Sequence, residues 1–250
     1  MKKILVPALL ATVVGTFSSV AQAAEPESTL AFNAGVVSDY RYRGLSQSRL
    51  EPALQGGVDY THKSGFYVGA WGSTIKWIKD TPGVTKGSVE VDLYGGYKGA
   101  VGDVAYDVGF LRYEYVNNNY KNVGANANTN EVYGAVTYGL FTAKYSHAIS
   151  DLFGNVNSKN SYYMDLSATV DLGDGYSLVP HVGYQKVKNT NPDASYTDYS
   201  LTLGKDLGNG FLLTGALVGT NADKAVTSYY TPAGKFTGKS GVVVGLKYTF

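Results

Sequence analysis

The chain of 250 residues contains no cysteine and only two methionines and two tryptophans. Without cysteine it forms no disulfide framework and has no thiolate to serve as a nucleophile or a metal ligand. It also lacks an excess of one charge, since 21 Lys and Arg face 20 Asp and Glu. A nucleic-acid-binding role is therefore not expected, because such proteins carry clustered basic charge.

Long apolar runs are also missing after the first residues of the chain. Lys2 and Lys3 precede an apolar stretch over 4–14, and Ala21-Gln22-Ala23 matches an A-x-A cleavage site. We predict a signal peptide over 1–23, removed near Ala23, and a single domain over 24–250. An N-terminal membrane anchor is disfavoured, because the run is shorter than the ~20 residues of a spanning helix and lacks a stop-transfer flank. Loss of Lys2 and Lys3 leaves 19 basic against 20 acidic residues, a net charge of −1.

What the chain does have is alternation of apolar with small or polar residues, most clearly at its C-terminus. Val242, Val244, Leu246, Tyr248 and Phe250 share one parity, and the intervening residues are small or polar. A strand between lipid and an aqueous lumen needs this pattern. A terminal Phe also resembles the signal that bacterial barrel-assembly machinery recognises, so Phe250 is predicted to mediate that contact.

Twelve segments of about ten residues show this alternation, close to the length of a tilted strand that crosses a membrane. Short joins, among them Asp174-Gly175 and Asn209-Gly210, take turns with long polar connections. We therefore predict an all-β, transmembrane, antiparallel up-and-down β-barrel of about twelve strands, with short periplasmic turns and long extracellular loops. The long connections are expected at 44–52, 75–87, 116–130, 150–160, 188–195 and 221–239.

Two segments are less regular. Between 103 and 115 the apolar parity slips, and we expect a β-bulge near Phe110 to restore the facing. In 66–74 both parities are apolar enough to face lipid. Tyr40, Tyr42, Tyr97, Tyr115 and Tyr248 are candidates for the aromatic girdles at the membrane interfaces.

Charged side chains of the opposite parity are expected to face the lumen, because Arg or Lys facing lipid at the midplane costs ~2–4 kcal/mol. The main candidates for a selectivity lining or constriction are Asp39, Arg41, Arg43, Asp59, Glu90, Asp92, Arg112, Glu114, Lys144 and Asp165. The same parity rule adds Lys98, Asp107, Glu131, Asp171, Asp198 and Lys247. A plug of internal salt bridges is the alternative, in which Arg41 and Arg43 pair with Asp59 or Glu90 on nearby strands.

The strings over 36–48, 52–60 and 64–69, which include Asp39-Tyr40-Arg41-Tyr42-Arg43-Gly44, carry a specific resemblance. They resemble the TorF family of bacterial porin-like proteins, formerly a class of unknown function. The resemblance implies an outer-membrane barrel and suggests passive transport.

Signals for enzyme chemistry are weak. His62 is expected in a tight turn, His181 has no evident nucleophile beside it, and His147 and Ser146 point to opposite faces of one strand. The histidines lack metal-ligand spacing. We expect no enzyme activity, no metal and no cofactor, although a catalytic triad assembled from distant strands stays open.

The resulting prediction is a porin of the bacterial outer membrane, with lipids and small solutes or ions as its partners. Ions or solutes would diffuse through a narrow charged lumen. The alternatives are a closed structural or adhesive barrel without transport and, less favoured, a membrane-embedded hydrolase.

Overall fold

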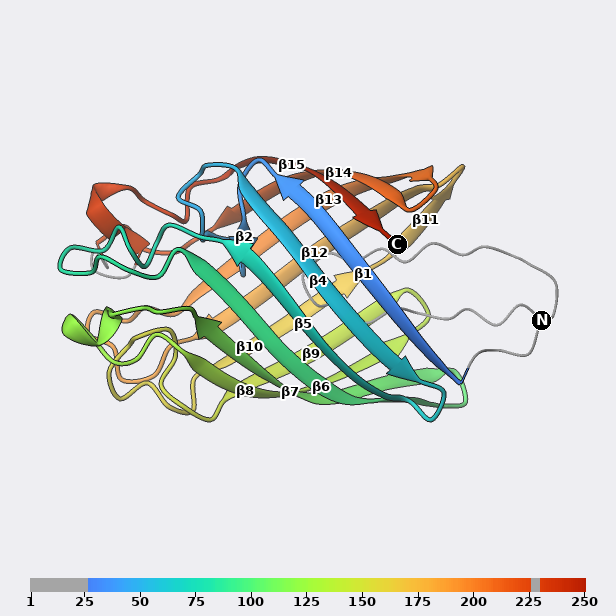
Figure 1. Ribbon diagram of the computed structural model, residues 1–250, viewed down its shortest axis with the longest axis horizontal. Coiled ribbons are helices and arrows are strands. Elements are labelled where there is room, and N and C mark those ends of the chain that lie inside the picture. Colours follow the sequence, from blue (N-terminus) through green and yellow to red (C-terminus); the bar gives the residue numbers. More distant parts are fainter. Residues whose placement is uncertain (1–26, 226–229) are drawn as a thin grey trace.

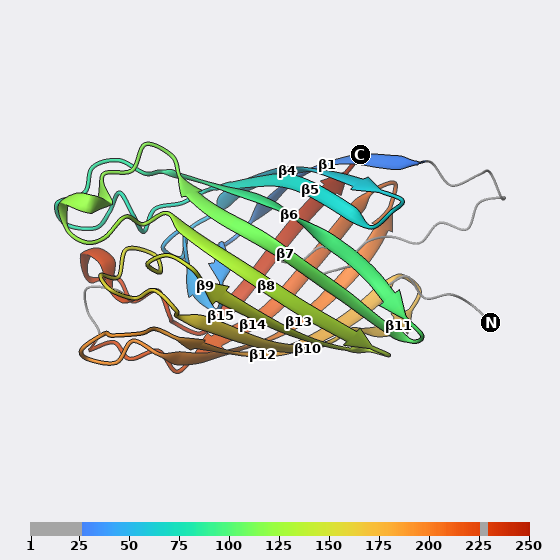
Figure 2. The ribbon, with the colours of Figure 1, turned by 90° about the horizontal axis from the view of Figure 1, so that it is seen from below.

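The computed structural model describes residues 27–225 and 230–250, so the predicted signal peptide lies outside the described residues. The strands form one antiparallel sheet that closes on itself as a barrel (Figures 1 and 2). Closure joins β1 to both β4 and β15, and β10 to both β9 and β12. Because β10 and β11 are two parts of one strand interrupted at Thr169, the barrel has twelve strands, as predicted.

The barrel strands follow one another around the wall in chain order. Their bounds are β1 Ser28–Val37, β4 Ala53–His62, β5 Phe66–Thr74, β6 Val89–Val101, β7 Val104–Tyr115, β8 Thr129–Tyr138, β9 Phe141–Ala148, β10 Tyr162–Ala168, β11 Val170–Gly173, β12 Tyr176–Lys186, β13 Tyr196–Gly208, β14 Phe211–Thr220 and β15 Gly241–Thr249. Two short 3-10 segments, η1 Tyr120–Asn122 and η2 Pro232–Gly234, lie in loops. Among the described residues, no helix is long and apolar enough to cross a membrane.

The connections alternate in length, which confirms the predicted asymmetry. Short turns at 63–65, 102–103, 139–140, 174–175 and 209–210 join strands at one end of the barrel, and longer segments join them at the other. The first strand starts at the turn end, where Ser28 pairs with His62, and the last residue lies there too. By the convention of such barrels, this end is periplasmic.

The outer face of the barrel is apolar. Phe66 and Val68 are exposed while Tyr67 is buried, so the ambiguous strand β5 turns its Phe66 parity outward. In β15, Val242, Val244 and Leu246 lie on the outer face, as expected from the sequence. These side chains are exposed because lipid, not protein, covers this surface in a membrane.

Strand β7 contains no bulge near Phe110, and that prediction is wrong. Its register with β6 and β8 runs without a shift along the whole strand. Leu111, Tyr113 and Tyr115 therefore point inward and are buried, while Arg112 and Glu114 point outward. The apolar parity changes because the loop end of the barrel has an aromatic interior, not because the backbone shifts.

The aromatic girdle is confirmed only in part. Tyr97 and Tyr248 face outward near the turns, and Tyr248 stacks on Phe211 with ring centroids 4.6 Å apart. Tyr40, Tyr42 and Tyr115 instead lie inside the barrel, packed in its aromatic core. The prediction was wrong for Tyr40 and Tyr42 because parity along one strand cannot show that the chain leaves the wall, and wrong for Tyr115 because β7 lacks the expected bulge.

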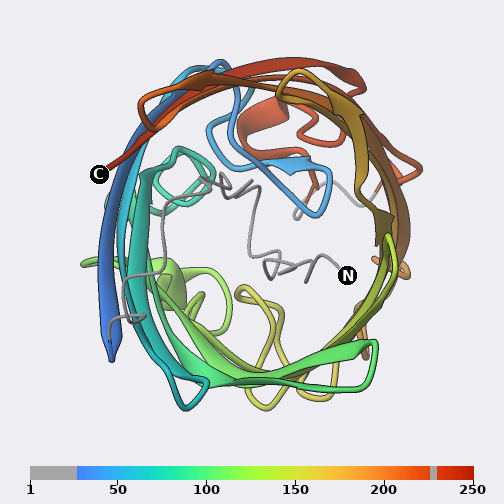
Figure 3. The ribbon, with the colours of Figure 1, turned by 90° about the vertical axis from the view of Figure 1, so that its right-hand side faces the viewer.

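The chain leaves the wall directly after β1. Residues 38–52 were expected to contain the first extracellular loop, but they fold back into the barrel as a small hairpin, with strands β2 Arg41–Tyr42 and β3 Leu45–Ser46. Figure 3 shows this hairpin in blue within the ring of strands. We call residues 38–52 the inner hairpin.

Candidate constriction site

The tip of the inner hairpin is a two-residue turn formed by Arg43 and Gly44. Both have positive φ, 47° and 77°, as a type I′ turn requires. Gly44 is needed for packing as well as for its backbone conformation. A Cβ at this position would lie 2.5 Å from Thr220 Cγ2 on β14 and 2.6 Å from Asp198 Cβ on β13.

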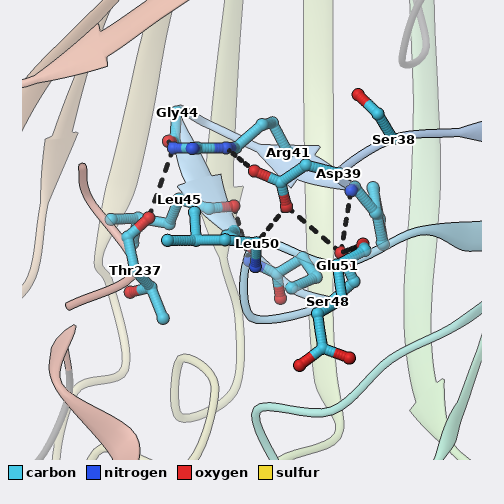
Figure 4. A network of polar contacts seen from close by, with 12 residues as sticks. Ser38, Asp39, Arg41, Gly44, Leu45, Ser48, Leu50, Glu51 and Thr237 are labelled. Carbon is cyan, nitrogen blue, oxygen red and sulfur yellow. Dashed lines mark hydrogen bonds and ion pairs between the residues drawn. The ribbon is translucent and has the colours of Figure 1, made fainter. Parts of the chain in front are cut away.

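Asp39 organises the base of the inner hairpin (Figure 4). Its carboxylate accepts hydrogen bonds from Arg41 Nε at 2.5 Å, Ser46 Oγ at 2.5 Å and Ser48 Oγ at 3.1 Å. Arg41 also donates to the Gly44 carbonyl at 2.9 Å and to the Thr237 carbonyl at 3.3 Å. The motif 39–48 thus holds its own shape and ties the hairpin to the last long loop.

Arg43 reaches across the interior. Its guanidinium donates two hydrogen bonds to the Glu131 carboxylate on β8, at 3.0 and 2.7 Å, and a third to Gln185 Oε1 on β12 at 2.6 Å. It also lies over the rings of Tyr42 and Tyr163, 4.8 and 4.3 Å from their centroids. Burial alone would lower the pKa of Arg43, but the adjacent Glu131 carboxylate raises it above its usual value. Arg43 therefore stays charged.

Other residues of the inner hairpin contact the wall on further sides. Tyr40 donates to Glu90 Oε1 on β6 at 2.8 Å, and burial raises the pKa of this phenol, which keeps it protonated. The Tyr42 hydroxyl is hydrogen-bonded to the Tyr113 hydroxyl on β7. Arg43 binds residues of β8 and β12, and Gly44 packs against β13 and β14. The inner hairpin therefore spans the barrel.

A small cavity remains between the inner hairpin and the loops. Its volume is about 40 Å³, room for a few water molecules. Its lining consists of Tyr42, Arg43, Leu45, Ser46, Gln47, Trp77, Tyr115, Phe153, Gln185, Tyr196 and Thr237.

Toward the turns, the wall holds carboxylates with tyrosine hydroxyls. Tyr94 donates to Asp59 Oδ1 at 2.5 Å, and Tyr67 donates to Asp107 Oδ1 at 2.6 Å. His181 Nε2 lies 2.7 Å from Asp165 Oδ2. These groups come from strands all around the barrel, so only closure of the sheet brings them to a common interior.

The positions of the candidate residues are mixed. Those that line the interior as wall residues are Asp59, Glu90, Asp92, Lys98, Asp107, Glu131, Lys144, Asp165, Asp171, Asp198 and Lys247, while Asp39, Arg41 and Arg43 do so from the inner hairpin. Their role in selectivity stays a prediction. The expected pairing of the arginines with Asp59 or Glu90 is wrong, since Arg41 pairs with Asp39 and Arg43 with Glu131.

Arg112 and Glu114 do not line the interior, contrary to expectation. They form an ion pair of 2.5 Å on the outer face, joined by Asn130 and Asn128 near the loops. In the pairing of β6 with β7, Arg112 lies opposite Leu93 and Glu114 lies opposite Val91, and both partners face outward. The error follows from the bulge that was expected in β7.

Sequence reasoning missed several residues that complete the site. Gln185 and Tyr163 contact Arg43, and Tyr40 and Tyr42 anchor the hairpin. The only available signal was the dense alternation of Tyr and Arg over 40–43, which is unusual for a lipid-facing strand. Their partners are more than a hundred residues away in some cases, so no local pattern could identify them.

Comparison with known proteins places the chain in a family. The family model described as "Bacterial protein of unknown function (Gcw_chp)" matches residues 21–250. The chain belongs to this family. No curated protein sequence matches it.

Solved structures with the same fold are outer-membrane channels. The KdgM porin is 8% identical, covers 89% of this chain and 99% of its own, and has a TM-score of 0.54. The same porin in complex with disordered oligogalacturonate gives a TM-score of 0.55, with 8% identity and the same coverage. The COG4313 outer membrane channel from Pseudomonas putida F1 is 12% identical, covers 90% of this chain and 96% of its own, and has a TM-score of 0.53. At these identities, the likeness shows the fold alone, and this chain shares the transmembrane barrel fold of these channels.

Proposed function

We propose that this protein is a narrow diffusion channel of the outer membrane, and that the inner hairpin is its constriction. The observation that supports this most directly is the Arg43–Glu131 pair, which links the hairpin tip to the far wall inside a twelve-stranded barrel. A barrel of this size lies between those filled by side chains and those with a wide aqueous channel. A segment that folds into such a barrel narrows its lumen without filling it.

The supporting features are polar and charged residues on the inner face throughout the barrel and the porin fold of its structural neighbours. The TorF resemblance of the motif over 36–48 agrees with this proposal. KdgM was solved with oligogalacturonate, whereas the proposal for this chain extends only to ions and small solutes as a class.

The test is the single-channel conductance of the refolded chain from Ala24 onward in a planar bilayer. We expect discrete conductance steps, and larger ones in Arg41→Ala/Arg43→Ala, because the substitutions remove the bonds from the hairpin to Glu131 and Gln185 on the wall and to Thr237 in the last long loop. Arg112→Ala is the matched control. It removes an arginine from the outer face and should leave the step size unchanged.

A closed structural barrel is the second candidate, and the contacts of the inner hairpin with strands on several sides of the wall favour it. The same experiment separates the two proposals. Folded protein, identified by its heat-dependent shift on a gel, that never conducts with or without the arginines would reject the channel.

The C-terminal residue has a proposed partner of its own. The Phe250 ring stacks on Phe32 with centroids 5.8 Å apart, and the two residues exchange backbone hydrogen bonds of 2.9 Å. We propose that the barrel-assembly machinery recognises Phe250 before this contact forms. Phe250→Ala should then lower the amount of protein assembled in outer membranes more than it lowers refolding into pure lipid, whereas equal losses in both would reject the idea.

A further inference from the structure

Four carboxylates of the barrel interior accept hydrogen bonds from tyrosine hydroxyls. Besides Asp59 and Asp107, Glu90 accepts from Tyr40, and Asp198 accepts from Tyr163 at 3.0 Å. A tyrosine hydroxyl donates a hydrogen bond to a carboxylate but brings no positive charge. The tyrosines therefore fix these carboxyl groups in position without adding positive charge.

The basic side chains of the interior are fewer and are used differently. Arg41 and Arg43 are engaged in ion pairs with Asp39 and Glu131. The Lys98 ammonium lies 4.3 Å from the Tyr67 ring centroid, and the Lys144 ammonium lies 4.2 Å from that of Tyr133. No direct ion pair of these lysines occurs among the residues that the structure describes.

The balance of charge in the wall strands and the inner hairpin, short of the turns, is negative. Six basic side chains, Arg41, Arg43, Arg49, Lys98, Lys144 and Lys247, face nine carboxylates, Asp39, Glu51, Asp59, Glu90, Asp92, Asp107, Glu131, Asp165 and Asp198. His181 lies between Asp165 and Asp198, and even when it is protonated the carboxylates stay in excess.

Two of these carboxylates carry an oxygen that has no hydrogen-bond partner in the described part of the chain. They are Glu90 Oε2 and Asp92 Oδ1, on residues that are only 1% and 6% exposed. Both residues lie on the inward face of β6, two positions apart and beside Tyr40 of the inner hairpin. Both side chains are almost inaccessible, so they contribute to the acidic character of the inner face without offering an open binding point.

We infer that the lumen selects cations over anions because fixed carboxylates outnumber basic side chains on its inner face. This inference rests on the channel function proposed above. Fixed carboxylates in a confined pore raise the local concentration of cations and exclude anions. Within the described residues, no group of three or more His, Asp or Glu is arranged to hold a metal ion.

The test is the zero-current potential of single channels between about 0.01 M and about 0.1 M KCl, where screening is weak. The zero-current potential of the wild type is expected to have the sign that indicates a higher permeability to K⁺ than to Cl⁻. Asp59→Asn/Asp107→Asn keeps a partner for each tyrosine while it removes two charges. It should lower the K⁺/Cl⁻ permeability ratio about sixteenfold, because a unit charge ~8 Å from the ion path in a water-like medium changes the occupancy of K⁺ and of Cl⁻ about twofold each, in opposite directions.

Glu114→Gln is the matched control, since it removes a carboxylate from the outer face and should leave the ratio unchanged. If the asparagine variant does not fold, Lys98→Gln/Lys247→Gln is the second test. It removes two positive charges from the interior, so the K⁺/Cl⁻ permeability ratio should rise. A conducting wild type that prefers Cl⁻ or has no preference overturns the inference and leaves the channel proposal intact. A wild type that never conducts overturns the channel proposal, and the inference falls with it.

Discussion

Removal of Arg43 should destabilise the barrel strongly, because the change leaves a buried charge without its partner. The Arg43 and Glu131 side chains are 6% and 1% exposed. Two unit charges about 4 Å apart in a medium of effective dielectric constant ~20 attract each other by ~4 kcal/mol. Removal of one partner of such a pair costs ~3–5 kcal/mol. We therefore expect Arg43→Ala to lower the free energy of unfolding by that amount.

The assay is reversible unfolding by urea of protein folded in lipid vesicles, followed by tryptophan fluorescence. Both tryptophans of the chain report on this region. Trp71 lies edge-on to Tyr40 with ring centroids 5.4 Å apart, and Trp77 contacts Tyr115 at 5.3 Å. A change at the inner hairpin should therefore alter the emission directly.

A double-mutant cycle isolates the pair. Arg43→Ala and Glu131→Ala should each be costly, and the double variant should be less destabilised than the sum of the two by about 2–3 kcal/mol. Arg112→Ala on the exposed outer pair is the control, and its expected cost is below about 1 kcal/mol. Costs below about 1 kcal/mol for both inner variants, with simple additivity, would refute the assignment of Arg43 as the anchor of the hairpin.

Three further predictions concern other parts of the chain. Gly44→Ala should cost at least ~1–3 kcal/mol in urea unfolding, because the added methyl group meets the wall at a positive φ. Val244→Arg, on the outer face near mid-strand and 50% exposed, should cost ~2–4 kcal/mol in vesicles, whereas Val101→Arg beside a turn should cost ~0–1 kcal/mol. In the loop at 187–195, hydrogen bonds from Ser195 and Lys186 lower the pKa of Asp193 to about 2, which carboxyl NMR titration should detect, and Ser195→Ala should reverse only the part due to the serine hydroxyl.

The sign of the pH effect on this loop follows from the direction of that shift. Because folding lowers the pKa of this carboxyl group, its ionised form stabilises the loop at pH values above about 4, the pKa of a free aspartate. This contribution disappears as the pH falls toward 2. Loop opening at neutral pH in the wild type would contradict this reasoning.

For the arginine substitutions, equal costs at the two outward positions would contradict the membrane depth assigned to them. An unchanged stability of Gly44→Ala would contradict the contact of the hairpin tip with the wall.

The amino-acid sequence by itself determined the wall of the barrel. Alternation with period two depends only on neighbouring residues, since successive side chains of a strand point to opposite faces. The strand number, the order of short and long connections and the outward parity of β15 are therefore predictable from local patterns alone. The inward parity of Asp59, Glu90, Asp92, Lys144 and Asp165 follows in the same way.

Tertiary structure alone decided where the inner hairpin lies and what it contacts. The motif over 39–48 alternates like a strand, but its partners Glu131, Gln185 and Thr237 are distant in the chain. Whether such a segment extends the wall or folds into the lumen depends on the aromatic interior at the loop end of the barrel, and that interior exists only after the sheet has closed. The same interior turned Leu111 and Tyr113 inward and Arg112 outward, because packing around the hairpin outweighs the local preference of apolar residues for lipid.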